Sequence, residues 1–466
     1  MPMNLDSRVE ARLGELVEAI GQSVRIRSVW SRPEHGMPYG RKIAEALDHA
    51  LQVSSSLGFR TRNLEGRVGF AEAGEGEETI AVVGHLDVVP EGSGWSFDPF
   101  GGGILDGKLC GRGTQDDKGP IFSALFALKA LEDHGHRFAR RVRIIFGTDE
   151  ERGTMEDLDF YRQSQKLPVW GFTPDGEYPV VYAEKGLLKV RGTKRFDREI
   201  PRALCLSGGF DQGTVPERAE AVLSLSRKEE EVAVSAMFRF ASLHGWDLRI
   251  QYLKEDRLRV CMGGTSAHAS MPWLGANAIV RLVHCLCQAE LPGETGELLK
   301  WLKRGFRDEG CGLELGLDVG DNPLGDLTCT LTTMRMDAGG IEFDLDIRYP
   351  ARSRSGFEIR DRLEERFREQ GISIEVRRSL DPLYVDPGSE LISALGAAYE
   401  KVTGEPPRLL AMNGTTYAKK LPGLVPFGAL FPGEPDLAHQ ADECVPISSL
   451  AKSTRIYAEA LRLLTS

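Results

Sequence analysis

Residues 82–100 read VVGHLDVVPEGSGWSFDPF, and they carry the pattern from which we predict the fold. A continuous apolar run ends at His85, and a carboxylate, Asp87, follows two positions later. Such a short apolar run is typical of a strand buried on both faces. Because residues i and i+2 of an extended chain point to the same side, Asp87 can reach the His85 ring. We interpret His85 as a metal ligand oriented by Asp87, with a capped strand end as the alternative.

The same plan recurs along the first part of the chain. Residues 141–147 (RVRIIFG) form another apolar run that ends near acids, and residues 171–186 follow the same order. Asp106-Gly107 predicts a hairpin, and Pro120 predicts the first turn of a helix. Strands and helices alternate, and polar residues follow the strands. This order predicts an α/β catalytic domain whose central, mostly parallel, twisted sheet is flanked by helices and binds ligands outside the carboxyl ends of its strands.

The pattern changes after Lys185. From there to about Leu380 the strands alternate apolar and polar residues, as in IEFDLDIRYPARS, and amphipathic helices lie between them. This pattern of alternating strands and amphipathic helices predicts an inserted α+β lid domain. We therefore expect a catalytic domain made of residues 1–185 and 383–466, and a lid domain made of residues 186–382.

The composition argues against some classes of partner. The 466 residues include 69 acidic and 58 basic ones, which gives a formal charge of -11, and no run of Lys and Arg forms a basic patch. We therefore expect no nucleic acid and no membrane as partner. No stretch approaches the roughly 20 apolar residues that span a bilayer. The charged N-terminus does not have the pattern of a secretory signal. The eight cysteines lack CxxC spacing, and we interpret them as small buried hydrophobes in a reducing compartment, which favours the cytoplasm.

Side chains that commonly bind metals follow the apolar runs or lie in glycine-rich turns. They are His85 with Asp87, Asp116-Asp117, Glu150-Glu151, Asp175 and His439. Two imidazoles and several carboxylates, without a thiolate, suit Zn²⁺ or Mn²⁺. One ion does not need so many acids. The set therefore predicts two divalent ions, about 3.5–4 Å apart, that share a bridging carboxylate.

Several of these residues have a second interpretation. Neighbouring residues on a strand face opposite ways, so one of Glu150 and Glu151 can hold metal while the other takes a proton from water. The alternative is that both belong to a solvated acidic turn. Asp116 and Asp117 can instead stabilise a helix N-terminus by roughly 0.3–1 kcal/mol. His439, in DLAHQADE, can be a histidine of a surface loop.

Taken together, the motifs resemble those of the dinuclear-zinc metallopeptidase family that includes aminoacylases, carboxypeptidase G, desuccinylases, carnosinases and bacterial dipeptidases. The matching segments, in the family's order, are GHLDVVP, GSGWSFDPF, GRGTQDDKGP, GTDEERG, TPDGEYP, GGTSAHAS, DIRYP and FPGEPDLAHQADE. Each motif is weak alone, but the ordered set is specific and spans most of the chain. The length, the W-x-x-x-P-F segment and the large middle domain are most similar to the monomeric bacterial dipeptidases, including those described as acting on Xaa-His dipeptides.

The resemblance implies a metal centre with assigned ligands. His85 and Asp175 would hold one ion, Glu151 and His439 would hold the other, and Asp116 would bridge both. It also implies two divalent ions, with Zn²⁺ expected first and Mn²⁺ or Co²⁺ as alternatives. As in the monomeric dipeptidases, we expect a monomer that takes a small peptide as substrate.

The resemblance also implies roles around the metals. Asp87 would orient His85, and Glu150 would be the general base. His268, in GTSAHAS, would polarise the scissile carbonyl or stabilise its oxyanion. Arg348, in DIRYP, would grip the substrate's terminal carboxylate, a task that suits a bidentate guanidinium.

The chain departs from the family pattern in two segments that would bind substrate. GTVPERAEA has Gly213 where the family's N-x-V-P stretch has Asn. NGTTYAK has Asn413 and Lys419 where the family's glycine-rich segment has Gly and Arg. The resemblance implies that Asn413 and Gly414 bind substrate. Neither segment contains an expected metal ligand. We therefore expect intact hydrolytic chemistry with an altered substrate preference.

These observations predict a metal-dependent dipeptidase that hydrolyses the peptide bond of unblocked dipeptides with a metal-bridged hydroxide. An N-acyl amino acid amidohydrolase of the deacylase or desuccinylase type would use the same centre and is the first alternative. A catalytically inactive binding protein on the same fold is the second. Retention of both Glu150 and Glu151 argues against it, because a pure binder does not need the second carboxylate.

Overall fold

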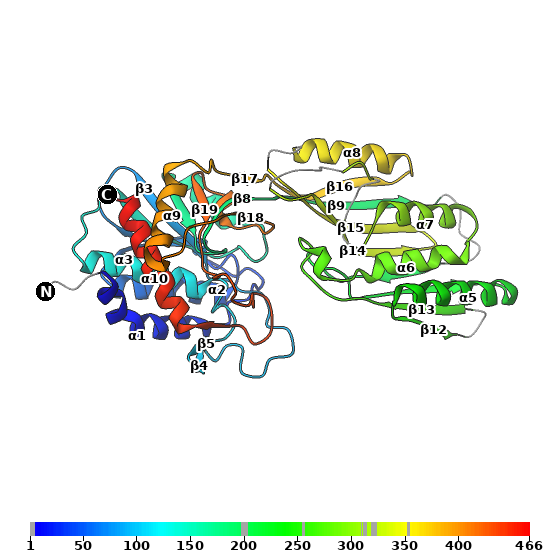
Figure 1. Cartoon of the computed structure of the whole chain (residues 1–466), viewed down its shortest axis with the longest axis horizontal. Coiled ribbons are helices and arrows are strands. Elements are labelled where there is room, and N and C mark those ends of the chain that lie inside the picture. Colours follow the sequence, from blue (N-terminus) through cyan, green and yellow to red (C-terminus); the bar gives the residue numbers. More distant parts are fainter. Residues whose placement is uncertain are drawn as a thin grey trace. The chain divides into compact units, whose positions relative to one another are not determined.

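The computed structural model describes residues 5–196, 204–253, 257–308, 310, 315–317, 324–351 and 355–466. The chain forms two compact units (Figure 1). The first unit consists of Met1–Ala183 and Leu383–Ser466, and the second consists of Glu184–Pro382. The second unit is thus inserted in the sequence of the first.

The first unit is built on a six-stranded sheet in the order β1-β2-β6-β3-β7-β19. Its strands are β1 (Arg60–Leu64), β2 (Val68–Ala73), β3 (Thr79–His85), β6 (Arg141–Gly147), β7 (Trp170–Thr173) and β19 (Leu424–Pro426). The four strands β6, β3, β7 and β19 pair in parallel, whereas β1 and β2 pair antiparallel at one edge. The mostly parallel α/β sheet that the sequence predicts is confirmed.

Strand β3 shows why this sheet is covered on both faces. All seven of its residues are buried. Ile80 and Val82 belong to one hydrophobic cluster, while Ala81 and Val83 belong to another. Successive side chains of a strand point to opposite faces, so an unbroken apolar run requires a protein layer on each side.

Helices form those two layers. They are α1 (Leu5–Val24), α2 (Arg41–Ser56), α3 (Lys118–Asp133), α4 (Glu156–Ser164), α9 (Glu390–Thr403) and α10 (Ile447–Leu464). Figure 1 shows α1, α3, α10 and α9 on one side of the first unit, where α1 and α10 each contact α3 and α9 contacts α10. Helix α3 is buried on nearly every side, and Pro120 lies in its first turn, where a missing backbone N–H costs nothing.

Two small sheets complete the first unit. One has the order β17-β8-β18, with β17 (Leu383–Tyr384), β8 (Val180–Glu184) and β18 (Leu409–Met412); the other has the order β20-β5-β4, with β20 (Cys444–Pro446), β5 (Lys108–Cys110) and β4 (Gly103–Leu105). The predicted hairpin at Asp106-Gly107 is confirmed. Both residues have positive φ, at 49° and 73°, which a two-residue turn of the common hairpin type requires.

The cysteine interpretation needs a correction. Cys110 and Cys444 form a disulfide between β5 and β20, so these two are not simple buried hydrophobes. They are directly opposite in the antiparallel register, with their Cα atoms 4.1 Å apart, yet they are 334 residues apart in the chain. Their spacing in the sequence therefore gave no signal. Cys285 and Cys329 are buried, whereas Cys205 is exposed.

The second unit contains an eight-stranded sheet in the order β12-β13-β11-β10-β14-β15-β9-β16, and its described pairs are antiparallel. Its strands are β9 (Gly186–Arg195), β10 (Cys205–Gly208), β11 (Arg218–Ser224), β12 (Leu248–Tyr252), β13 (Arg257–Gly263), β14 (Thr328–Asp337), β15 (Gly340–Tyr349) and β16 (Ser373–Leu380). The helices are α5 (Arg227–His244), α6 (Ala278–Leu286), α7 (Gly293–Gly305) and α8 (Gly356–Arg368), and Figure 1 shows them along the strands. This is the α+β architecture expected of the lid.

Strand β15 explains the alternating pattern of the second unit. Phe343, Leu345 and Ile347 belong to the hydrophobic cluster that also contains residues of the four helices. The residues between them, Asp346 and Arg348 among others, therefore point to the opposite face of the sheet. Among the helices of the described residues, we find none that combines the length and apolarity needed to cross a membrane.

Gly84 provides a test of the close packing between β3 and α3. A Cβ at this position would lie 2.1 Å from Oδ2 of Asp117 and 2.9 Å from Cβ of Ile121. Gly84→Ala should therefore lower the free energy of unfolding by about 1–3 kcal/mol, the usual cost of overpacking. The measurement is urea unfolding followed by tryptophan fluorescence.

Gly14→Ala is the matched control, because a Cβ at Gly14 of α1 would meet nothing within 4 Å. This helical substitution should instead raise the stability by about 0.5–1 kcal/mol. Equal stability of the two variants would contradict the tight contact at Gly84.

Candidate metal centre

The candidate residues of the first unit come from three adjacent strands and two loops. His85 is the last residue of β3, Glu150 and Glu151 follow β6, and Asp175 follows β7. Because β6, β3 and β7 are parallel neighbours, their carboxyl ends meet at one edge of the sheet. Asp116 lies just before α3, and His439 lies in the loop that leads to β20.

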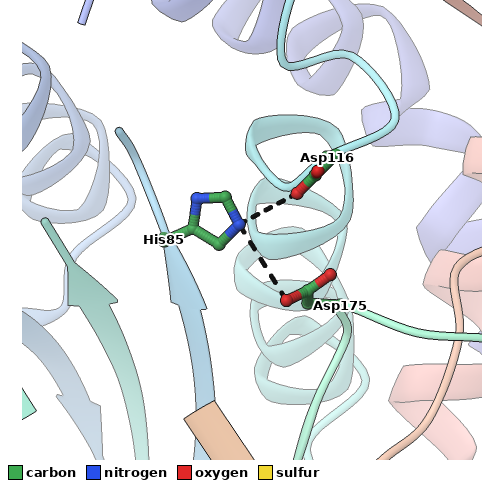
Figure 2. A group of neighbouring side chains, drawn as sticks. All are labelled: His85, Asp116 and Asp175. Carbon is green, nitrogen blue, oxygen red and sulfur yellow. Dashed lines mark hydrogen bonds and ion pairs between the residues drawn. The ribbon is translucent and has the colours of Figure 1, made fainter. Parts of the chain in front are cut away.

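A first group of potential metal ligands consists of His85, Asp116 and Asp175. Nε2 of His85 lies 2.9 Å from Oδ1 of Asp116 and 4.0 Å from Oδ2 of Asp175. Figure 2 shows the His85 ring at the end of its strand, with both carboxylates directed at the same ring nitrogen. The three side chains thus converge on one point.

A second group consists of Asp116, Glu151 and His439. Nε2 of His439 lies 3.1 Å from Oδ2 of Asp116 and 3.0 Å from Oε2 of Glu151. Asp116 belongs to both groups and directs one carboxylate oxygen to each imidazole. This is the arrangement that a bridging carboxylate would need.

Asp87 contacts His85 differently from our expectation. Nδ1 of His85 lies 2.9 Å from the backbone oxygen of Asp87, while the nearer carboxylate oxygen is 3.7 Å away. The Asp87 carboxylate instead accepts backbone N–H hydrogen bonds from Glu150 (3.3 Å) and Glu151 (3.0 Å). Asp87 therefore holds the His85 ring with its backbone oxygen. It holds the Glu150-Glu151 turn with its side-chain carboxylate.

Asp117 has a role that the sequence did not indicate. It precedes α3, but its carboxylate does not cap that helix; Oδ2 accepts the backbone N–H of His85 at 3.0 Å. The end of β3 is thereby tied to the start of α3. This contact also explains the need for glycine at position 84, where a larger residue would collide with Asp117.

The two imidazoles are strongly basic in this acidic environment. Burial alone would lower the pKa of His85, but its hydrogen bond to Asp116 and the surrounding carboxylates raise it well above its usual value. The charge of Glu151 raises the pKa of His439 well above its usual value, against the effect of burial. The electrostatic field at the edge of the sheet thus favours positive charge.

The carboxylates respond in opposite ways to the same surroundings. Burial would raise the pKa of Asp116, but hydrogen bonds from His439 and His85 hold it far below its usual value. Burial and the nearby carboxylates raise the pKa of Glu150 well above its usual value, although the charge of His85 opposes this. The same surroundings thus favour the anionic form of Asp116 and the protonated form of Glu150.

The donor set fits divalent cations. Six carboxylates lie around two imidazoles at this edge; they are Asp87, Asp116, Asp117, Glu150, Glu151 and Asp175. Two buried cations near them have other partners: Nζ of Lys118 donates to two backbone oxygens, and Arg112 pairs with Glu443. Buried negative charge without a counter-charge is costly, and oxygen and imidazole donors suit Zn²⁺ and Mn²⁺.

Glu150 and Glu151 differ in their contacts. Oε1 of Glu151 accepts the backbone N–H of Val89 at 3.1 Å, and Oε2 meets His439. Within the part of the chain that the structure describes, no donor is hydrogen-bonded to the Glu150 carboxylate. Glu151 is therefore held in a ligand position, and Glu150 is the better candidate for a proton acceptor.

His268 and Arg348 belong to the second unit. Nδ1 of His268 lies 2.6 Å from Oγ of Ser270 and accepts the backbone N–H of Ser270 at 3.2 Å. A neutral ring in this setting carries its proton on Nε2 and donates from there. Nε and Nη2 of Arg348 donate to Asp346 at 2.6 and 3.1 Å, so one edge of the guanidinium is fixed by its own strand.

The segments that depart from the family pattern lie in loops. Gly213 is close to the His268 loop of the second unit, because its backbone oxygen accepts the N–H of Ala269 at 2.7 Å. Asn413 and Gly414 form a bend after β18, ahead of a short 3-10 helix, Tyr417–Lys419. The structure gives no contact between Asn413 or Gly414 and the two ligand groups.

Tyr417 is a residue of this region that sequence reasoning missed. Its hydroxyl donates to the buried Asp157 and accepts the backbone N–H of Asp149 at 3.2 Å. Its ring lies edge-on to the His85 ring, with centroids 6.3 Å apart. Tyr417 lies within the NGTTYAK segment, but only the tertiary structure brings its hydroxyl beside the turn that follows β6.

Comparisons with known proteins establish the family and the fold of this chain. The family model described as "Peptidase family M20/M25/M40" matches residues 81–463 of this chain. A Bacillus subtilis (strain 168) protein named "Putative dipeptidase YtjP" is 34% identical over 467 residues, which cover 98% of this chain and 99% of that protein. Among solved structures, the M20 family metallo-carboxypeptidase Sso-CP2 from Sulfolobus solfataricus aligns with a TM-score of 0.60 at 18% identity, over 96% of this chain and 99% of that one.

Human carnosine dipeptidase 1 aligns with a TM-score of 0.58 at 14% identity, over 99% of both chains. At such low identity the two structures establish the shared fold. The family match, by contrast, extends over most of the chain, and the bacterial relative aligns over nearly its full length. The chain belongs to the peptidase family M20/M25/M40.

Proposed function

We propose that this protein is a metal-dependent dipeptidase that cleaves the peptide bond of small, unblocked peptides. One observation carries the proposal: Asp116 directs one oxygen to each of two imidazoles, while Glu150 stands beside them without a hydrogen-bond donor among the described residues. A site that only binds metal would need the shared carboxylate of Asp116, but it would not need the additional carboxylate of Glu150. The bacterial relative named a dipeptidase supports the choice of substrate.

We propose that the centre holds two divalent ions, with Zn²⁺ first and Mn²⁺ or Co²⁺ as alternatives. His85 and Asp175 would hold one ion, Glu151 and His439 would hold the other, and Asp116 would be shared. Bound ions of this kind lower the pKa of water towards about 7 and polarise a carbonyl group.

The protein's own residues would then carry the protons. Glu150 would accept a proton from the attacking water and later return it to the leaving amine. Burial and the nearby carboxylates raise the pKa of Glu150, and this direction suits a carboxylate that has to take up a proton. Asp87 would keep Glu150 in place through the backbone of the turn.

We further propose that His268 and Arg348 act on the substrate. His268, held as a donor at Nε2 by Ser270, would stabilise the oxyanion. Arg348, fixed along one edge by Asp346, would bind the terminal carboxylate of the peptide. Asn413 and Gly414 would contribute to substrate binding in the segment where this chain departs from the family pattern.

We propose a monomer that acts in the cytoplasm. The second unit forms a complete eight-stranded sheet by itself, which supports a lid that needs no second copy. The free cysteines Cys205, Cys261, Cys285 and Cys287 are typical of a reducing compartment. In that compartment the Cys110–Cys444 disulfide would be open to reduction.

Removal of metal tests the core of the proposal. Dialysis against a chelator should abolish peptide hydrolysis, because the carboxylates and imidazoles alone lack the Lewis acid that activates water. Adding back Zn²⁺, Mn²⁺ or Co²⁺ in separate samples should restore turnover, measured by release of free amino acids. A pure sample that hydrolyses dipeptides equally well after chelation would overturn the proposal.

Substitution of the two glutamates separates base from ligand. Glu150→Gln should lower kcat by about 10²–10⁴-fold, the usual contribution of a general base, while the bound metal stays constant. Glu151→Gln should instead reduce the metal content, because Glu151 contacts His439 directly. Metal content is measured by elemental analysis after gel filtration, and the opposite pattern would mean that the two roles are exchanged.

Matched substrates separate the dipeptidase from the amidohydrolase alternative. We expect hydrolysis of free dipeptides and at least tenfold lower kcat/KM for their N-acetylated forms, a difference of about 1.4 kcal/mol. The acetyl group removes the ammonium charge that the acidic centre attracts. Cleavage of the acetylated forms alone would establish the N-acyl amidohydrolase instead.

A further inference from the structure

Glu443 lies in the same loop region as His439 and is fully buried, at 0% exposure. Its Oε1 accepts backbone N–H hydrogen bonds from Gly113 (3.0 Å), Gln115 (2.9 Å) and Asp116 (3.3 Å). One oxygen near the C-terminal end therefore collects three donors of the segment that ends in Asp116. The partners are 327 to 330 residues apart in the chain.

The second oxygen of Glu443 is also occupied. Oε2 accepts a hydrogen bond from Nη1 of Arg112 at 2.7 Å, and Arg112 is itself 1% exposed. The Arg112 guanidinium lies over the Trp95 ring, 5.1 Å from its centroid. The Glu443 carboxylate thus has a full set of partners, all of which hold it against the segment 112–116.

Further contacts join the same two parts of the chain. The backbone N–H of Gly111 donates to the backbone oxygen of Glu443 at 2.9 Å. The N–H and the hydroxyl of Ser96 both donate to Asp442, at 2.7 and 3.0 Å. Hydrogen bonds from Ser96 and Gly111 therefore hold the loop around Glu443 in place. Within this loop, the Glu443 carboxylate accepts the backbone N–H of Asp116.

We propose that Glu443 is a positioning residue for the metal centre, an inference that rests on the proposed dinuclear site. By fixing the backbone of residues 113–116, it places the Asp116 carboxylate between the two imidazoles. The loop that carries Glu443 also carries His439, so one side chain sets the position of two ligands from opposite ends of the chain. Loss of the carboxylate would leave three buried or partly buried N–H groups and a guanidinium without this acceptor.

Metal binding is the direct test, because it does not require substrate. Metal-free wild type, Glu443→Ala and Glu443→Gln are titrated with Co²⁺ at one fixed pH, and bound ion is measured by equilibrium dialysis and by the visible spectrum of bound Co²⁺. Partners outside the direct ligand set commonly change metal affinity by 10–100-fold. We expect Glu443→Ala to weaken the more loosely held ion by about that factor and to change the Co²⁺ spectrum.

Glu443→Gln should weaken binding less. The amide oxygen can still accept the three N–H groups, whereas the amide nitrogen cannot accept from Arg112. This graded order separates a positioning role from a general loss of stability. If Glu443→Ala does not fold, an unchanged affinity and spectrum in Glu443→Gln would overturn the proposal, and a weakened, altered site would support it.

Glu459→Ala is the matched control. Glu459 is another buried glutamate (3% exposed) paired with an arginine, Arg462 at 2.6 Å, but it lies within α10 and contacts neither ligand group in the described structure. It should alter Co²⁺ affinity by less than about twofold, as expected for an independent site. Equal loss of affinity in Glu459→Ala and Glu443→Ala would overturn the positioning role.

The same titration distinguishes this inference from the proposed function. A wild type that binds no Co²⁺ would refute the metal centre itself. A wild type that binds two ions, together with a Glu443→Ala variant of the same affinity and spectrum, would refute only the role of Glu443.

Discussion

The concentration of buried negative charge at one edge of a sheet is the constraint that organises the first unit. Asp116 lies between two imidazoles, and Asp175, Glu150 and Glu151 lie around them. Partly buried carboxylates so close together repel one another, so nearby positive charge stabilises the arrangement. The surrounding carboxylates raise the pKa of both imidazoles and so favour their charged forms, and divalent ions would supply positive charge more completely.

The fold meets this demand with rigid supports. Three parallel strands end at the same edge and deliver His85, the Glu150-Glu151 turn and Asp175. The remaining carboxylates do not all face the ions. Asp87 and Asp117 each accept backbone N–H groups and thereby tie the ends of adjacent elements together. The acids at this edge thus divide into those that can bind cations and those that hold the backbone.

Much of this could be predicted from the sequence because the signal is local. The unbroken apolar run of β3 requires two covering layers, and the turn at Asp106-Gly107 requires positive φ. The Asp87 contact was harder to predict. An extended chain allows its carboxylate to reach His85, but the competing N–H groups of Glu150 and Glu151 come from the turn after another strand, β6. The Cys110–Cys444 pair and the hydroxyl of Tyr417 likewise depend on partners that are remote in the chain.

The amino-acid sequence by itself determined the strands, their polar ends and the identity of the residues that gather around His85. Only the tertiary structure decided which oxygen of Asp116 faces which imidazole, and which of two adjacent glutamates is engaged. It also decided that Glu443 reaches back to the segment before α3. The physical reason is that strand periodicity depends on near neighbours, whereas a hydrogen bond between residues 116 and 443 exists only after the chain has closed a loop of 327 residues.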